Sequence, residues 1–172
     1  STDLAITLAS GKNWFRVPET IKIIVNGKLP KGVYSKDIIL SIVKDIGSNG
    51  ATYKAVEFYG EAITALSVDA RLTISNMAVE MGAKAGLMEA DSKVLKWVAQ
   101  TGSKREPKPV HADIDARYIA IKTYDVSKLQ PQVASPHAVD NVSDVDELTD
   151  VKIDQAFLGT CTNGRLEDLA AA

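Results

Sequence analysis

The sequence predicts an α/β fold, because segments with a strand pattern alternate along the chain with segments that have a helix pattern. Residues 19–25, 53–59 and 116–124 alternate in side-chain character as strands do. The segments between them place apolar residues at helical spacing instead. The chain has 172 residues, of which 45% are hydrophobic and 24% charged, so it can bury a core for one domain, or for one domain and part of another.

The first elements predicted are a helix and a strand. Residues 1–10 carry apolar residues at roughly helical spacing, and Gly11 is expected to end a helix that packs on the core. The strand over 19–25 places Ile21, Ile23 and Val25 on one side. Asn26-Gly27 after it is typical of a hairpin turn.

A core helix is predicted to begin at Ser35, whose hydroxyl is suited to cap it, and to end at Gly47. Its apolar residues form one wide face, which indicates packing and no chemistry. These residues are Ile38, Ile39, Ile42, Val43 and Ile46.

A second helix is predicted from Ser67, as its cap, to about Met81. Asn76 and Glu80 are four residues apart and therefore project from one face. Spacing alone gives these two side chains no function, because polar residues on an exposed helix face are ordinary.

The elements that follow are a short strand, a helix and an exposed loop. Residues 82–87 are small and apolar, which suits a buried strand or close packing of the sheet on helices. Asp91 is expected to cap a helix that runs through Val98. Residues 103–110, which contain two prolines, are expected to form an extended loop.

The single cysteine, Cys161, lies in the turn Gly159-Thr-Cys-Thr-Asn-Gly-Arg165 between a predicted strand, 153–158, and a predicted helix that begins near Leu166. Ligands of open α/β folds often bind at such turns. A thiol there is a candidate nucleophile or metal ligand, although a lone cysteine is also commonly an inert buried side chain. A thiol enzyme needs a base, and His111 and His137 are the only histidines.

The composition excludes several classes of protein. The net charge of −2 and the lack of a basic run argue against a nucleic-acid partner. No apolar stretch approaches the ~20 residues that a membrane span needs. One cysteine cannot form an internal disulfide, which fits a reducing cytoplasm.

Four segments of the chain resemble the aconitase superfamily, and within it the group of isopropylmalate dehydratase and homoaconitase large subunits. The match at the cysteine covers Ile153 to Leu169, and a second covers Ile74 to Gly86. The remaining matches, which complete the family's order along the chain, are Ser1-Thr2-Asp3 with Gly11 to Thr20, and Gly50 to Phe58.

The resemblance implies a site as well as a fold. The fold would be an aconitase-type three-layer α/β/α sheet domain followed by the start of a similar domain. Cys161 would be one of three thiolates that hold a [4Fe–4S] cluster, and Asn76 and Glu80 would face the active-site cleft. Asn163 and Arg165, on the cysteine loop, would hydrogen-bond cluster or substrate.

The implied activity is that of a hydro-lyase that moves a hydroxyl between neighbouring carbons of a small hydroxy-polycarboxylate. Isopropylmalate, in leucine biosynthesis, is the first expectation for the substrate, and homocitrate is the alternative. The resemblance also implies a small subunit as partner, which carries the catalytic base. The competing interpretation is a structural α/β fragment without activity.

The resemblance further predicts that this chain is an internal fragment. The family's Cys-x-x-Cys pair and its Asp-Ser-His-Thr motif are both missing, so the chain alone is expected to be inactive and to lack the cluster. Its expected division is residues 1–16 as the tail of a first domain, 17–130 as a second α/β domain and 131–172 as the start of a third.

Overall fold

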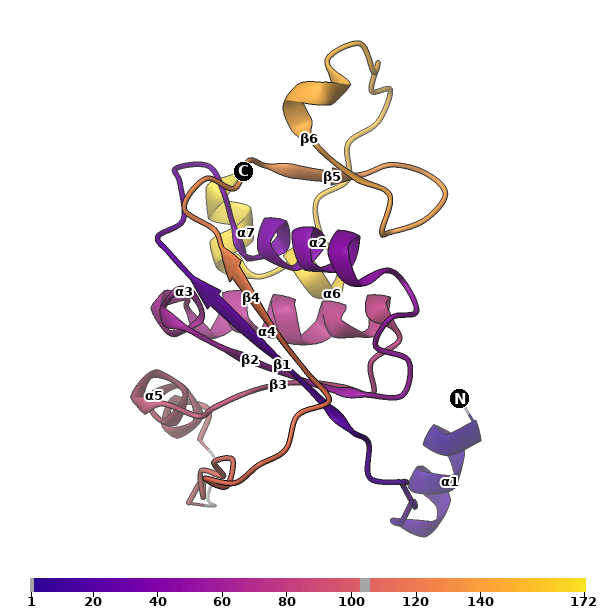
Figure 1. The fold of residues 1–172 in the computed structure, drawn as a ribbon, viewed down its shortest axis with the longest axis vertical. Coiled ribbons are helices and arrows are strands. Elements are labelled where there is room, and N and C mark those ends of the chain that lie inside the picture. The colour runs from indigo at the N-terminus through magenta and orange to yellow at the C-terminus, as the bar shows by residue number, and fades with distance from the viewer. Residues whose placement is uncertain (1, 103–105) are drawn as a thin grey trace.

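A four-stranded parallel sheet forms the centre of the computed structural model, which describes residues 2–102 and 106–172. The strands are β1 (Thr20–Asn26), β2 (Ala55–Tyr59), β3 (Ala85–Met88) and β4 (Ala120–Asp125), in the spatial order β3-β2-β1-β4 (Figure 1). Parallel strands need crossover connections, and the chain supplies them through helices. The predicted α/β class is confirmed.

Two helices cover one face of this sheet. They are α2 (Ser35–Ile46) and α4 (Val68–Met77), which follow β1 and β2 and contact each other (Figure 1). The predicted inward side of β1 is fully buried beneath them, as is most of the apolar face of α2. The core therefore consists mainly of branched aliphatic side chains between the sheet and these helices, with the aromatic ring of Phe58 among them. The branched residues include Ile23, Val25, Ile38, Ile42, Val43, Val56 and Ile74.

The start of α2 differs from the prediction. Tyr34, not Ser35, is the N-cap residue, and the side chain of Asp37 accepts the Tyr34 backbone N–H at 2.7 Å. Ser35 already has helical geometry, so a carboxylate in the first turn satisfies the free N–H instead of the predicted hydroxyl.

The helix α4 begins as predicted and continues into a 3-10 turn, η1 (Ala78–Met81). Ser67 accepts the N–H of Ala70, which confirms its role as the cap. Strand β3 approaches α4 very closely at Gly86, where an added Cβ would lie 2.7 Å from the Cβ of Ala78. The small residues of 82–87 thus permit the close packing that the sequence predicted. The alternative of a buried strand is wrong, because β3 is only half-buried and Leu87 is exposed.

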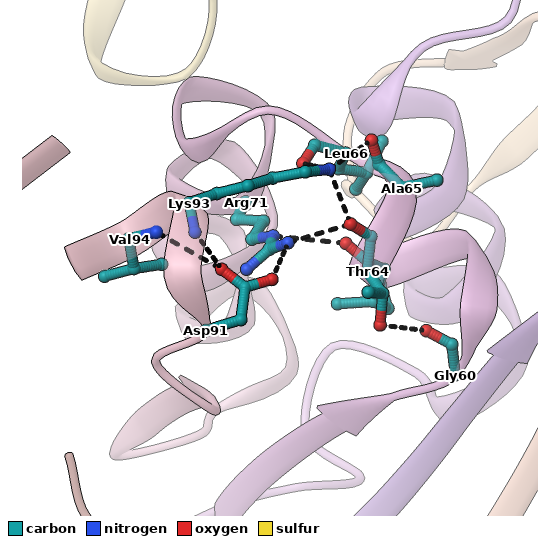
Figure 2. Close-up of polar contacts among 9 residues, drawn as sticks. Gly60, Thr64, Ala65, Leu66, Arg71, Asp91, Lys93 and Val94 are labelled. Carbon is teal, nitrogen blue, oxygen red and sulfur yellow. Dashed lines mark hydrogen bonds and ion pairs between the residues drawn. The ribbon is translucent and has the colours of Figure 1, made fainter. Parts of the chain in front are cut away.

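A buried arginine joins three helices, namely α3 (Glu61–Ala65), α4 and α5 (Ser92–Gln100). Arg71 of α4 is 5% exposed, and its guanidinium donates to the carbonyls of Ile63 and Thr64, at 3.1 and 2.9 Å, and to Asp91 at 2.6 Å (Figure 2). Asp91 also caps α5, as predicted.

Lys93 completes this cluster at the end of α3. Its ammonium donates to the carbonyls of Thr64, Ala65 and Leu66, at distances of 2.7 to 3.2 Å (Figure 2). The last carbonyls of a helix lack partners within the helix, so these cations stabilise the end of α3.

The other face of the sheet carries polar and aromatic side chains. Glu57 of β2 accepts hydrogen bonds from Tyr59 at 2.8 Å and from Tyr118 at 3.0 Å. Lys22 of β1 lies over both tyrosine rings, 4.3 and 4.9 Å from their centres. Burial, together with bonds to Tyr118 and Glu57, raises the pKa of Tyr59, so its hydroxyl stays protonated.

The C-terminal part adds small elements above α2 and α4. Strands β5 (Gln132–Ala134) and β6 (Val142–Asp144) form an antiparallel pair, and η2 (Val145–Leu148) follows. The short helices α6 (Thr160–Asn163) and α7 (Leu166–Ala171) end the chain near α2 and α4 (Figure 1). The predicted helix at Leu166 is confirmed, whereas α6, which contains the cysteine, was not predicted.

Three further sequence predictions are wrong. Residues 153–158 form no strand, because a strand requires a neighbour for its backbone groups and these residues lie exposed without one in the described structure. Asn26-Gly27 forms no hairpin, since both neighbours of β1 are parallel to it. The helix α1 (Thr2–Ser10) exists, but it buries none of its residues and lies apart from the sheet (Figure 1).

Two predicted segments extend beyond the described residues. Ser1, at the start of the predicted first helix, lies outside them, as do residues 103–105 of the predicted loop. Residues 106–110 are exposed and carry no regular secondary structure, in agreement with the prediction for that part.

Candidate functional site

The cysteine turn is a single helical turn that sits on α4. Gly159 precedes it, and Thr160 begins it with a φ of 73°, a left-handed value that is uncommon for a β-branched residue. The Thr160 hydroxyl lies 3.2 Å from that of Thr162, inside the turn. The exposed Cys161 thiol therefore projects from a tight turn rather than from the end of a strand.

One face of α4 and η1 carries four polar residues, and the first three of them contact the segment from Cys161 to Arg165. Asp69, Thr73, Asn76 and Glu80 are separated by four, three and four residues, which is the repeat of one helix face. We call these four residues the polar face of α4. The amide of Asn76 donates to the sulfur of Cys161 at 3.3 Å.

A pocket of about 550 Å³ opens beside the Cys161 thiol. Three of the residues singled out from the sequence, Asn76, Glu80 and Cys161, line it together. The structure thus brings a thiol, a carboxamide and a carboxylate from distant parts of the chain to one cavity. The other lining residues come from α2, the end of α4, the β5 region and the turn itself: Lys36, Asp37, Leu40, Met77, Gln132, Val133, Ala134, Val139, Thr160 and Thr162.

Two charged lining residues were not identified as site residues from the sequence. Lys36 and Asp37 lie in the first turn of α2, a helix expected to have only a packing role. Asp37 is buried, and it also accepts the backbone N–H of Gln132 at 2.8 Å, which ties β5 to α2. No local pattern signals this contact, because Asp37 and Gln132 are 95 residues apart.

The other two predicted loop residues do not line the Cys161 pocket. The Asn163 amide donates to Asp168 at 3.1 Å and lies in a separate hollow of about 610 Å³ between the start of α2 and α7. Arg165 points to α4, where it donates to the hydroxyl of Thr73 at 3.0 Å. Their place in the structure indicates a part in holding the loop.

Neither histidine lines the Cys161 pocket. The ring of His111 lies 3.4 Å from the carboxylate of Glu89, and both side chains are largely exposed. His137 follows Pro136 in the exposed turn between β5 and β6. The thiol-enzyme alternative therefore lacks an imidazole base at the thiol.

The donor set for a metal is incomplete in this chain. Within the residues that the structure describes, no three His, Cys, Asp or Glu side chains are arranged to hold a metal ion. A four-iron cluster is held by several thiolates, and this sequence contains one cysteine. Cys161, exposed at the pocket, can supply one ligand, but the chain by itself does not fit a complete cluster.

Among the described residues, none of the helices has the length and apolar character needed to cross a membrane. The longest described helix, α2, has 12 residues.

Comparison with known proteins places the whole chain among close relatives. Residues 1–151 match the aconitase family (aconitate hydratase). The chain is 55% identical over its full length to 3-isopropylmalate dehydratase large subunit 1 of Thermotoga maritima and 51% identical to large subunit 2 of Archaeoglobus fulgidus. A probable methanogen homoaconitase large subunit of Methanosarcina mazei is 49% identical, again over the full chain.

The chain spans only part of these relatives. It covers 42% of the Thermotoga maritima protein, 41% of that of Archaeoglobus fulgidus and 44% of that of Methanosarcina mazei. The match to the family nevertheless covers residues 1–151, which include the whole parallel sheet. The chain belongs to the aconitase family.

Proposed function

We propose that this chain is part of the large catalytic subunit of a hydro-lyase that interconverts 2-isopropylmalate and 3-isopropylmalate by dehydration and rehydration, a reaction of leucine biosynthesis. The observation that carries the proposal is the shared pocket of Cys161, Asn76 and Glu80, in a chain about half identical to isopropylmalate dehydratase large subunits. The activity belongs to the complete enzyme, and this chain alone is expected to be inactive.

Cys161 is the proposed ligand of a [4Fe–4S] cluster in that enzyme, with further thiolates supplied from outside these 172 residues. When bound, such a cluster supplies an iron that acts as a Lewis acid towards a hydroxyl group. The Asn76 amide, which already contacts the sulfur, would orient the ligand and donate to it.

The pocket's charged residues have proposed roles towards the substrate. Glu80 is exposed on the pocket wall and would accept a hydrogen bond or hold a proton near the reacting hydroxyl. Lys36, which lines the same pocket from the start of α2, would attract a substrate carboxylate. Asn163 and Arg165, for which the resemblance implied hydrogen bonds to cluster or substrate, would instead hold the loop through their contacts with Asp168 and Thr73.

The proposed division of the chain has residues 1–16 as the end of a first domain, 17–130 as the second α/β domain and 131–172 as the start of a third. The isolated position of α1 supports the first boundary. The separate β5–β6 sheet supports the second. The proposed partner is a small subunit, as the names of the relatives indicate for those proteins, and the proposed location is the cytoplasm.

The homoaconitase reaction is the second candidate, and the Methanosarcina mazei relative favours it. A hybrid large subunit separates the two. This chain would replace the matching segment of the Thermotoga maritima large subunit, and the hybrid would be assayed with that protein's small subunit on isopropylmalate and on homocitrate.

Turnover of isopropylmalate that is lost on Cys161→Ser supports the proposal. Turnover of homocitrate alone favours the second candidate. A folded, iron-loaded hybrid that turns over neither acid contradicts both.

A further inference from the structure

The Cys161 turn is attached to α4 by contacts that do not involve its thiol. We propose that Thr73 is a positioning residue that, with Arg165, clamps this turn onto the polar face of α4. For the enzyme reaction this inference rests on the proposed function, but the clamp itself is a property of this chain.

Thr73 is buried and bonds directly to the backbone of the cysteine turn. Thr73 is 1% exposed, and its hydroxyl donates to the carbonyl of Thr162 at 2.7 Å. The alternative acceptor in its own helix, the carbonyl of Asp69, is farther away at 3.4 Å. A hydroxyl has one proton to give, so the shorter geometry directs it to the turn.

Arg165 closes the clamp from the other side. Its guanidinium donates to the Thr73 hydroxyl at 3.0 Å and to the Thr162 carbonyl at 3.3 Å. Its Nε lies 3.9 Å from the carboxylate of Asp69, and the side chain is 24% exposed. Arg165 therefore contacts two residues of the polar face, Thr73 and Asp69, and also bonds to Thr162 within its own turn.

The clamp fixes the backbone next to the cysteine. Thr162 follows Cys161 directly, so anchoring the Thr162 carbonyl sets the direction in which the thiol projects. Asn76 lies three residues after Thr73 on the same face and meets the sulfur. The polar face thus holds the turn at one position and contacts the thiol one helical turn further on.

The segment before the turn gives it little support. Residues 151–158 are exposed and carry no regular secondary structure. Beyond the turn, the Ser67 hydroxyl donates to Glu167 at 2.7 Å, which attaches α7 to the start of α4. Thr73 is the fully buried member of these attachments, so its hydroxyl is the one that water replaces least readily.

Amide hydrogen exchange, measured by mass spectrometry on the 172-residue chain without iron, tests the clamp. In Thr73→Val, amides of residues 160–169 are expected to exchange about tenfold faster, as loss of one or two hydrogen bonds implies, while those of β1 and β2 keep their wild-type rates. Thr73→Ser, which keeps the hydroxyl, should restore slow exchange.

Two further variants make the result specific. Ser75→Ala removes a hydroxyl of the same helix that donates to Gly86 at 2.6 Å, away from the turn, and should leave residues 160–169 unchanged. Arg165→Met should accelerate their exchange without altering the core, and it repeats the test if Thr73→Val fails to fold.

Three results would overturn the proposal. The first is a wild-type turn whose amides exchange as fast as those of an unstructured peptide. The second is that Thr73→Val and Arg165→Met both keep wild-type exchange rates. The third is a Thr73→Ser variant whose amides exchange as fast as those of Thr73→Val. Cys161→Ser should keep the turn protected, because the clamp does not use the thiol. A failed clamp and a failed cluster assignment are therefore distinguishable, since only the latter is tested by iron binding.

Discussion

The side-chain amide of Asn76 donates to the sulfur of Cys161 at 3.3 Å, across 85 residues of chain. This contact joins α4, one of the two helices that cover the parallel sheet, to the turn that carries the only cysteine of the sequence. Hydrogen bonds to sulfur tune iron–sulfur centres, and groups that orient a metal ligand contribute strongly to metal affinity. The pairing therefore links the fold to the proposed chemistry.

Replacing Asn76 by alanine is expected to reduce activity without reducing stability. Asn76 is exposed, so the free energy of unfolding should change by no more than about 0.5 kcal/mol. The activity of the hybrid enzyme should fall about 10–100-fold, as is typical when a partner of a metal ligand is removed. Asn163→Ala is the control, because Asn163 donates to Asp168 and does not line the Cys161 pocket. An equal loss in both variants would argue against a specific role for Asn76.

Asp37 is expected to hold β5 against the start of α2. Its carboxylate accepts two backbone N–H groups, those of Tyr34 and Gln132, and Asp37→Ala leaves both without a partner. We expect a loss of about 2 kcal/mol in the free energy of unfolding and faster proteolysis of residues 127–131, measured by denaturant titration and timed digestion. Lys36→Ala, on the adjacent position, should change neither, and a stable, resistant Asp37→Ala would refute the assignment.

The Arg71–Asp91 pair is expected to be a major source of stability for the helices around β3. Asp91→Asn keeps a residue that caps helices well but removes the charge opposite a buried guanidinium. We predict a loss of about 2 kcal/mol, less than for a fully buried pair because the Asp91 side chain is 32% exposed. Thermal unfolding of the wild type and of Asp91→Asn measures this loss of stability, and equal unfolding midpoints would contradict the prediction.

The same pair predicts a specific dependence of stability on pH. The Arg71 guanidinium lowers the pKa of Asp91 below its ordinary value of 3.8. The contribution of the pair to the free energy of unfolding is therefore complete at pH values above that ordinary pKa. It is lost as the pH falls through the lowered pKa of Asp91 in the folded state. Denaturant titrations from neutral to acidic pH should show a shallower decline in Asp91→Asn than in the wild type.

Asp45 also stabilises the fold at neutral pH and loses its contribution to the free energy of unfolding in acid. Lys122 and Tyr124 donate to its carboxylate at 2.6 and 2.7 Å, and these bonds lower the pKa of Asp45. Part of the acid decline should consequently remain in Asp91→Asn. A variant whose acid decline is as steep as that of the wild type would show that Asp91 does not contribute.

Much of the fold follows from periodicity within single segments. The buried side of β1, the apolar face of α2 and the cap at Ser67 all appear in the structure as the sequence predicts. These features depend on local spacing and on one residue's own chemistry. The predicted strand over 153–158 failed for the opposite reason, because a strand depends on a neighbour that its own residues do not encode.

In the candidate site too, some residues could be identified from the sequence, whereas others depend on tertiary contacts. The resemblance singled out Cys161, Asn76 and Glu80, which the structure brings to one pocket. It did not indicate Thr73, because a threonine within a helix pattern looks neutral until the turn that it contacts is placed beside it. The direction of Arg165, towards α4, likewise depends on tertiary contacts between distant segments.

Cys161 is the proposed ligand of an iron–sulfur cluster, and the proposed function depends on this assignment. The most direct measurement is the visible absorbance of the hybrid large subunit after anaerobic reconstitution with iron and sulfide, compared with its Cys161→Ser variant. The proposal predicts a cluster band in the first protein, with iron and sulfide bound in equal amounts, and a strong loss of both in the variant. Equal iron content and equal absorbance in the two proteins would show that Cys161 is not a ligand.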